Sequence, residues 1–357
     1  MAIPVEVSPI RAFQKCPKQY EYRYQRHLKP KVSRKAIWLG TQLHLAFEDS
    51  YTLGWDKALE RIDTRWAEAT DDQREEYGDS PMPSDVRRLV RSYRETYADD
   101  DWNILHVEHH MEGEIAGRHV EGTADVIAEI PILGEGLTIV DRKSTTRIPG
   151  TTVQLLDPQL ALYAVMAREL EDLDVRRVMF DYVVTKPPTK PKVVGLSDKI
   201  RKDGTFREGK GPRLSSLGSI NTDEWTLLEA IRDAKDEHGK FINEEVYADD
   251  LKKLHARPMS ENPFFRRVVT ELTEPIARGA IREMFMMNEL MEGTLRMVKS
   301  GTGVFPRHVG PFTCPHCEMR HLCDAELQEH PDDIKNALEN FEVQEWSPQK
   351  EGEIAEV

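Results

Sequence analysis

The sequence predicts one α/β domain with helical additions, and three observations support this prediction. Helical spacing of apolar residues gives way to strand-like alternation over 104–130 and returns over 154–170. The resulting order of helices, strands, helix and strand is typical of a single α/β domain. The chain also has 357 residues, which is enough to bury a substantial core.

The predicted elements follow from periodicity and from turn residues. Helices are predicted at 8–28, 36–52, 55–71 and 83–101, and strands at 104–117, 120–130 and 137–143. A helix at 154–170, a buried strand at 177–185, a charged helical stretch at 222–256, a strand at 264–270 and a helix at 273–299 complete the set. Ser8 and Pro9 match an N-cap and a first turn. The Gly-, Lys- and Ser-rich segment 195–220 predicts a mobile excursion.

The formal net charge of −14 argues against a protein that coats nucleic acid with a basic surface. It still permits an enzyme that grips a few phosphates locally. Basic residues do cluster near the N-terminus, at Lys15, Lys18, Arg23, Arg26, His27, Lys29, Lys31, Arg34 and Lys35. A solvated helix face explains this cluster equally well.

Targeting signals are not visible in the sequence. No apolar run approaches the roughly 20 residues that a membrane span needs. The opening MAIPVEVSPIRAFQKC lacks the apolar core of a secretory signal. The cytoplasm is therefore the expected location.

The most informative segment ends the strand at 137–143 with Asp141, Arg142 and Lys143. Because side chains alternate along a strand, Asp141 and Lys143 project from one face and Arg142 from the other. A carboxylate beside an ammonium can bind a divalent cation and orient an attacking water at the same time. A surface ion pair at a strand end is the alternative for these two residues taken alone.

Asp125 lies upstream, in a strand of otherwise small or apolar residues. A charge in such a strand is costly unless it is paired or bound to metal. Gly122 would allow close backbone approach. Two carboxylates from neighbouring strands offer the hard oxygen ligands that Mg²⁺ or Mn²⁺ prefers. The alternative is that Asp125 caps a turn.

Two predicted helices add polar candidates. His44 lies on the helix at 36–52, although a lone helical histidine is more often a core or surface residue than a ligand. Gln159 and Tyr163 share one face of the helix that follows the Asp141 strand. An amide and a phenol there could donate to a phosphate or brace Lys143, but ordinary helix packing explains them equally well.

The chain has four cysteines: Cys16, Cys314, Cys317 and Cys323. In a cytosolic chain, a cluster of three such residues favours a metal site over disulfides. Thiolates at this spacing can bind Zn²⁺ or a [4Fe–4S] cluster. Local spacing alone favours zinc, because His316 or His321 could supply a fourth ligand and leave Cys16 free.

These motifs, in this order, resemble the PD-(D/E)XK superfamily nucleases of the RecB type: His44, Asp125, Asp141-Arg142-Lys143, Gln159 and Tyr163. With the four cysteines, the chain resembles their iron–sulfur branch, which includes the CRISPR-associated iron–sulfur exonucleases and the AddB-like nuclease domains. The opening Phe13–Tyr24 also matches the usual start of these domains. The resemblance covers 8–185 and 304–326, whereas 186–300 carries no motif that can be placed.

The resemblance implies a restriction-endonuclease-like core, a mixed central sheet flanked by helices, with a C-terminal cysteine-cluster region. It also implies a single nuclease domain over 1–340 that precedes an acidic flexible tail at 341–357. The parts of this domain are an N-terminal helical part (8–102), a catalytic core (103–185), an insertion with helices (186–300) and a cluster-binding tail (304–326).

The resemblance further implies a role for each matching residue. Four groups would bind the divalent metal: His44, Asp125, Asp141 and the backbone carbonyl of Arg142. Lys143 would orient the attacking water, and Gln159 and Tyr163 would contact the DNA strand or steady Lys143. Glu108 would add an outer carboxylate. Many relatives carry Glu where this chain has Asp141, but the shorter side chain still ligates metal.

The resemblance reverses the preference for zinc. It implies a [4Fe–4S] cluster on Cys16, Cys314, Cys317 and Cys323, with a structural role as a clip between the two ends of the chain.

The predicted function is therefore that of a metal-dependent DNA nuclease, an exonuclease that hydrolyses phosphodiester bonds at single-stranded ends. Single-stranded DNA or duplex ends are the expected substrates. A helicase, a recombinase or a CRISPR-type protein is a candidate partner, and no membrane partner is expected. Two alternatives remain: a non-catalytic DNA-binding or assembly subunit that retains the nuclease fold, and a metallohydrolase that acts on a small phosphoester.

Overall fold

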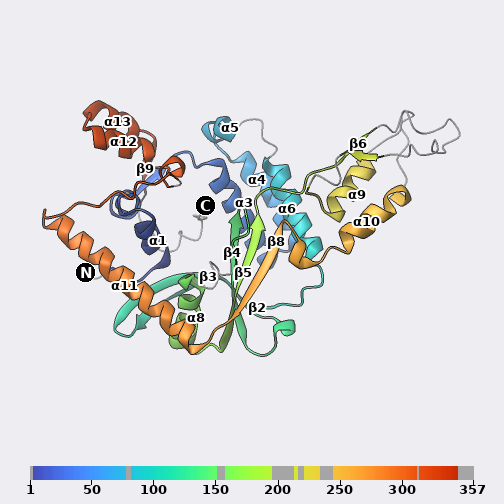
Figure 1. Ribbon diagram of the computed structural model, residues 1–357, viewed down its shortest axis with the longest axis horizontal. Coiled ribbons are helices and arrows are strands. Elements are labelled where there is room, and N and C mark those ends of the chain that lie inside the picture. The colour runs from blue at the N-terminus through green and yellow to red at the C-terminus, as the bar shows by residue number, and fades with distance from the viewer. Residues whose placement is uncertain are drawn as a thin grey trace.

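A five-stranded sheet lies at the centre of the molecule. The computed structural model describes residues 3–77, 82–150, 157–194, 213–215, 221–233, 244–311 and 313–344. In spatial order, the strands are β2 (Asn103–Ile115), β3 (Arg118–Glu129), β4 (Leu137–Thr145), β5 (Val175–Val184) and β8 (Phe265–Glu271). Neighbouring strands are antiparallel except for β4 and β5, which are parallel. The mixed central sheet is therefore confirmed (Figure 1).

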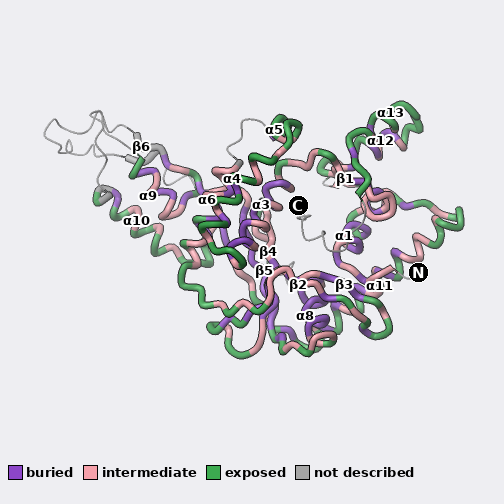
Figure 2. The backbone as a smooth tube through the Cα atoms, turned by 180° about the vertical axis from the view of Figure 1, so that it is seen from behind, coloured by how far each residue is buried: buried purple, intermediate pink, exposed green. Residues whose placement is uncertain are grey.

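One face of the sheet is covered by α8 (Pro158–Glu171), which connects β4 to β5. Parallel strands need a crossover of this kind, because a tight turn cannot join them. Residues 159–167 of α8 are all buried, since α11 (Glu274–Lys299) packs on its outer side and α1 (Val7–Lys15) packs on α11. Figure 2 shows buried residues gathered along α8 and the neighbouring strands.

The opposite face is covered by α3 (Lys35–Thr52), α4 (Trp55–Ala67) and α6 (Met82–Thr96), with the short α5 (Asp71–Tyr77) between the last two in sequence. Aromatic rings hold this layer together. The ring centroid of Tyr93 lies 4.6 Å from that of Phe47 and 5.4 Å from that of Phe265. The predicted helices at 36–52, 55–71 and 83–101 are thus present, the last two with earlier ends.

The predicted helix at 8–28 is wrong as a single element. It divides into α1, α2 (Pro17–Tyr20) and a π-helix, η1 (Glu21–Gln25). Cys16 is extended between them, with φ −164° and ψ 111°. A residue before proline is disfavoured in the α region, so Pro17 explains the break. The predicted N-cap is also wrong, because α1 begins at Val7 with Glu6 in the cap position.

The two ends of the chain meet in a small unit. The strand β1 (Leu28–Pro30) pairs antiparallel with β9 (Phe341–Val343). The turn η5 (Cys314–His316) and the helices α12 (Arg320–Gln328) and α13 (Pro331–Leu338) precede β9. The predicted flexible tail therefore begins as a paired strand, and its residues 345–357 lie outside the described residues.

The connection from β5 to α11 carries the remaining elements. They are β6 (Lys192–Val194), β7 (Arg213–Ser215), α9 (Glu224–Asp233), η3 (Glu244–Tyr247), α10 (Ala248–His255) and η4 (Met259–Glu261). Within the predicted excursion 195–220, only β7 is described, and it pairs with β6. The predicted helical stretch 222–256 contains α9 and α10, and its middle lies outside the described residues. None of the helices described combines the length and apolarity needed to cross a membrane.

Candidate active site

A fork in the sheet creates the site. β3 pairs with β4 only from Val126 to Glu129, then continues with β2 as far as Arg118 while β4 continues with β5. Asp125 is the first residue beyond the shared ladder. Its Oδ2 accepts a hydrogen bond of 2.7 Å from the backbone N–H of Arg142. The carboxylate thus pairs with the N–H of Arg142, which has no partner on β3 beyond the end of the shared ladder.

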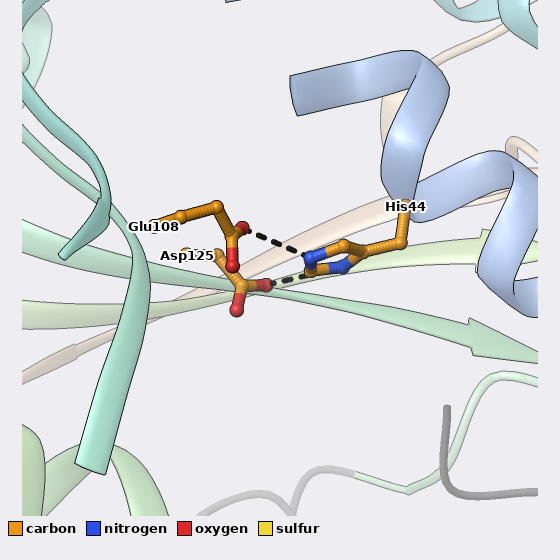
Figure 3. A group of neighbouring side chains, drawn as sticks. All are labelled: His44, Glu108 and Asp125. Atoms are coloured by element: carbon orange, nitrogen blue, oxygen red, sulfur yellow. Dashed lines mark hydrogen bonds and ion pairs between the residues drawn. The ribbon is translucent and has the colours of Figure 1, made fainter. Parts of the chain in front are cut away.

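Three potential metal ligands converge at this fork (Figure 3). His44 reaches from α3, with Nε2 at 2.9 Å from Oε1 of Glu108 and Nδ1 at 3.9 Å from Oδ2 of Asp125. Among the residues that the structure describes, this is the one group of three His, Cys, Asp or Glu ligand atoms within 4.8 Å of one another. Glu108 has a φ of 49°. Such a left-handed conformation is uncommon for glutamate and concentrates at functional sites.

A second chain of contacts runs from β4 to α8. Asp141 is only 3% exposed, and its Oδ2 lies 3.1 Å from Nζ of Lys143. The same Nζ donates to Oε1 of Gln159 at 2.9 Å, and Nε2 of Gln159 donates to the hydroxyl of Tyr163 at 3.3 Å. Lys143 is therefore held from two sides.

The start of α8 positions Gln159. Asp157 is the N-cap, and its Oδ1 accepts from the backbone N–H of Gln159 at 3.0 Å. Pro158 occupies the first helical position, where its missing N–H costs nothing. Arg11 of α1 pairs with the same carboxylate of Asp157. The first turn of α8 is thus anchored to the N-terminal helix.

Residues of both sets, with the exception of Glu108, line one cavity of about 100 Å³. The predicted residues in its lining are His44, Asp125, Asp141, Arg142, Lys143, Gln159 and Tyr163. Gly122 also lines it, and a Cβ there would lie 2.5 Å from Cε1 of Tyr163. The close backbone approach predicted at Gly122 is therefore made, and it admits the tyrosine ring.

The carboxylates and the burial of the cavity shift the pKa values of two of its residues. Burial raises the pKa of Asp141 to about 7, with Asp125 adding to the rise and Lys143 opposing it. Burial alone would lower the pKa of His44. The charge of Asp125 and the hydrogen bond and charge of Glu108 outweigh it and raise that pKa to about 9. The imidazole is consequently charged at neutral pH.

The comparisons with known proteins bear on what this cavity does. A model of the PD-(D/E)XK nuclease superfamily matches residues 5–324. The chain belongs to this superfamily. Its members are phosphodiester hydrolases that generally use divalent metals.

Two solved structures are similar to parts of this chain, at low sequence identity. A structure named "Putative exonuclease" from Eubacterium rectale is 10% identical, with a TM-score of 0.40 over 89% of this chain and 86% of the other. A structure named SSO0001 is 12% identical, with a TM-score of 0.18 over 70% of this chain and 87% of the other. A search of curated proteins found no match.

In this member of the superfamily, the side chain of Arg142 lies on the far side of β4 from the cavity residues Asp141 and Lys143. Its guanidinium donates to the hydroxyl of Tyr51 at 2.6 Å and to Oδ2 of Asp181 at 3.1 Å, and it lies 4.0 Å from the ring centroid of Phe47. The alternation predicted for Asp141-Arg142-Lys143 therefore holds. A ligand role for the Arg142 carbonyl remains a proposal.

Some residues of the cavity escaped the sequence prediction. Glu6, Ser8, His110 and Glu121 line it as well. Glu108 was expected as an outer carboxylate, but it approaches His44 more closely than Asp125 does. Its position depends on the positive φ, which no pattern of the sequence displays.

The four cysteines line a second cavity of about 430 Å³, at the junction of the two chain ends. The backbone N–H of His308 approaches Sγ of Cys16 at 3.5 Å, and Nε of Arg307 approaches Sγ of Cys323 at 3.2 Å. Burial raises the pKa of the Cys317 thiol, and Cys16 and Cys323 add to the rise. The structure thus brings together thiols that are almost 300 positions apart in the sequence.

Proposed function

We propose that this chain is a metal-dependent deoxyribonuclease, an exonuclease on single-stranded DNA ends. The observation that carries the proposal is the convergence of Asp125, Asp141 and Lys143 on one cavity, in a chain whose superfamily hydrolyses phosphodiester bonds. Asp141 is buried, and Lys143, two residues later on the same face of β4, is held in place by hydrogen bonds. This arrangement is typical of a hydrolytic site and differs from a surface ion pair. DNA is the proposed substrate.

The residues at the fork fit a divalent ion. The ligand atoms of His44, Glu108 and Asp125 lie within 4.8 Å of one another, and two of them are carboxylate oxygens, which suit Mg²⁺ or Mn²⁺. We propose that His44, Asp125, Asp141 and the carbonyl of Arg142 hold the ion, with Glu108 at its edge. When bound, such an ion supplies Lewis-acid polarisation of a phosphate and a water.

The other residues would act directly on substrate and water. Lys143, held by Asp141 and Gln159, would donate from Nζ to the attacking water and fix its direction toward phosphorus. Gln159 and Tyr163 would steady this ammonium or donate to a phosphate oxygen. The narrow cavity would exclude bulk water around these groups, which strengthens each electrostatic contact.

The test is degradation of end-labelled single-stranded and duplex DNA with Mn²⁺, Mg²⁺ or EDTA. We expect metal-dependent cleavage that Asp141→Ala lowers by about a hundredfold or more. Asp174→Ala removes an exposed carboxylate just before β5 and is the matched control, with activity unchanged. Equal residual cleavage by wild type and Asp141→Ala would indicate contamination. An inactive but folded wild type that still binds DNA would favour the non-catalytic subunit.

We further propose that Cys16, Cys314, Cys317 and Cys323 hold a [4Fe–4S] cluster. The four thiols line one cavity of about 430 Å³, which offers room for a group bound by four thiolates. The N–H groups directed at Cys16 and Cys323 are partners that cluster sulfurs commonly have.

Protein purified without oxygen tests this proposal. Brown protein with iron and acid-labile sulfide, which is lost in Cys16→Ser, would support the cluster. Colourless wild type with stoichiometric zinc would refute it and restore a zinc site with His316 or His321.

We also propose a single nuclease domain over 1–340, acting in the cytoplasm, with a helicase, a recombinase or a CRISPR-type protein as partner.

A further inference from the structure

A basic cleft lies between α6 and α9, away from the catalytic cavity. It has a volume of about 300 Å³ and is lined by Ser84, Arg87, Arg88, Arg91, Trp225 and Glu229. The net charge of the chain is −14, yet α6 carries four arginines between residues 87 and 94. Three of these four line the cleft, so it concentrates positive charge on an otherwise acidic protein.

The cleft has cationic groups available to an anion. Arg91 is exposed and has no ion pair with any residue in the described part of the chain. Arg87 pairs with the half-exposed Asp63, and Arg88 lies 3.5 Å from Asp85. The Arg87–Asp63 pair is largely exposed, so it is weak and screened by salt, and phosphate oxygens can replace its carboxylate. The Arg88–Asp85 pair is half-buried, but its N–O distance of 3.5 Å is long.

The acidic residue in the lining is also compensated. The carboxylate of Glu229 lies 3.7 Å from Nζ of Lys190, which pairs with Asp233 as well. Lys190, in the β5–β6 connection, therefore partly neutralises Glu229. The carboxylate then repels an anion in the cleft less than an unpaired carboxylate would.

Trp225 adds an aromatic surface to these cations. It is half-buried at the start of α9, and it has no ring pair or cation–π contact with another of the described residues. Arginines beside a partly exposed indole form the combination that binds single-stranded nucleic acid, with phosphates on the cations and a base stacked on the ring. Duplex DNA keeps its bases inside, so stacking on Trp225 requires a single strand.

A short stretch of chain connects the cleft to the catalytic cavity. Val183, near the end of β5, lines that cavity. The carbonyl of Pro188, five residues later, accepts a hydrogen bond of 3.5 Å from Nη1 of Arg88. Five residues span at most about 18 Å. In Figure 1, α3 and α6 lie beside the carboxyl ends of β4 and β5, and α9 packs against α6.

We propose that the cleft binds the single strand of DNA a few nucleotides away from the bond cleaved in the catalytic cavity. This inference rests on the proposed nuclease function and extends it with a second, sequence-independent contact. Arg88 and Arg91 bind phosphates, and Trp225 stacks on a base. A substrate long enough to reach both sites is held more tightly than a short one.

The experiment measures binding of fluorescent single-stranded oligonucleotides of about 4 and about 12 nucleotides, in EDTA to prevent cleavage. We expect Trp225→Ala to weaken binding of the longer one about fivefold or more. Arg91→Ala should weaken it and reduce the slope of log affinity against log salt by about 0.7, the value for one phosphate on a single strand. Neither change should affect the shorter one. Arg278→Ala, on α11, removes an exposed arginine elsewhere and should change neither affinity.

The outcomes separate this inference from the nuclease proposal. Equal affinity of wild type, Arg91→Ala and Trp225→Ala for the longer oligonucleotide overturns the cleft while the nuclease stands. The same is true if the two variants instead lose affinity for polyglutamate, which would make the cleft a protein-docking site. Wild type that neither binds nor cleaves either oligonucleotide overturns the nuclease proposal and this inference with it.

Discussion

At the scale of single residues, the catalytic cavity is arranged to exchange protons for a metal ion. His44 lies between two carboxylates that raise its pKa to about 9, and burial raises the pKa of Asp141 to about 7. A metal can bind only a neutral imidazole and an ionised carboxylate. A metal ion that binds here would therefore compete with protons for His44 and Asp141.

The first prediction follows from these two pKa values. Below about pH 9 the imidazole of His44 carries a proton, which a metal ion must displace when it binds. The affinity for Mn²⁺ should therefore rise about tenfold per pH unit between about pH 7 and pH 8.5. Below about pH 7, the proton on Asp141 steepens this dependence. Calorimetry in buffers of different ionisation enthalpy should detect proton release. His44→Gln should abolish the dependence above pH 7, and binding without proton release would contradict the prediction.

A second prediction concerns Gly122. A methyl group there would meet the ring of Tyr163, so Gly122→Ala should displace the tyrosine and cost about 1–3 kcal/mol of unfolding free energy. Nothing lies within 4 Å of a Cβ at Gly279 in α11, and Gly279→Ala should leave stability unchanged or raise it. Thermal unfolding of both variants, with cleavage assays, makes the comparison. A fully stable and active Gly122→Ala would show that the ring can move aside at little cost.

At the scale of the elements, a buried ionic network joins the sheet to the helices that supply the site. Asp181 of β5 is fully buried between Arg142 of β4 and Arg267 of β8. Tyr93 of α6 donates to the same carboxylate. Phe47 of α3 packs against Arg142, which the network holds in place. His44 lies one turn earlier on α3, so the network also sets the distance of His44 from β4.

The third prediction tests this network. Asp181→Asn removes a buried charge and leaves two guanidinium groups facing a neutral amide, which should cost about 3 kcal/mol or more of unfolding free energy. Asp174→Asn, in an exposed position before β5, should leave it unchanged. Denaturant unfolding of the two variants checks the difference. Equal stability would mean that Arg142 and Arg267 find other partners.

Most strands of the sheet and most residues of the cavity could be predicted from the sequence. Strands β2 to β5 lie within a few residues of their predicted bounds. Alternation indicates β2 and β3, whereas a continuous apolar run indicates β5, which is buried along almost its whole length. Six residues chosen for their chemistry line one cavity: His44, Asp125, Asp141, Lys143, Gln159 and Tyr163. The strand β9 was missed because three residues, of which only Phe341 is buried, carry no period. The break at Cys16 was missed because helical spacing continues on both sides of Pro17.

At the scale of the whole molecule, the N-terminal and C-terminal segments depend on each other. Glu326 of α12 accepts from the hydroxyl of Tyr22 at 2.7 Å and pairs with Lys18 and Arg26. The cysteine cavity and the β1–β9 pair lie beside these contacts. The small cluster of apolar residues in this unit is separate from the two large clusters on the faces of the sheet. The unit can therefore loosen without unfolding the sheet.

The fourth prediction is that loss of the proposed cluster loosens both segments together. In Cys16→Ser, or after removal of the cluster with a chelator, amide exchange should accelerate in α2, α12 and α13, whereas β4 and β5 remain protected. Ser92→Ala, buried in α6, is a comparison change remote from the cysteines. Unchanged exchange in the C-terminal segment would show that Glu326 and β9 hold the ends together without the cluster.

Arg142 links the amide that binds Asp125 to a guanidinium enclosed by Phe47, Tyr51 and Asp181. The middle position of Asp141-Arg142-Lys143 is thus as restricted in this chain as the two positions beside it. An uncharged residue there would leave the buried carboxylate of Asp181 without one of its two cationic partners. Replacement of Arg142 is therefore expected only together with compensating changes at those neighbours, so that this position varies jointly with the helical layer and independently of the residues proposed to perform the hydrolysis.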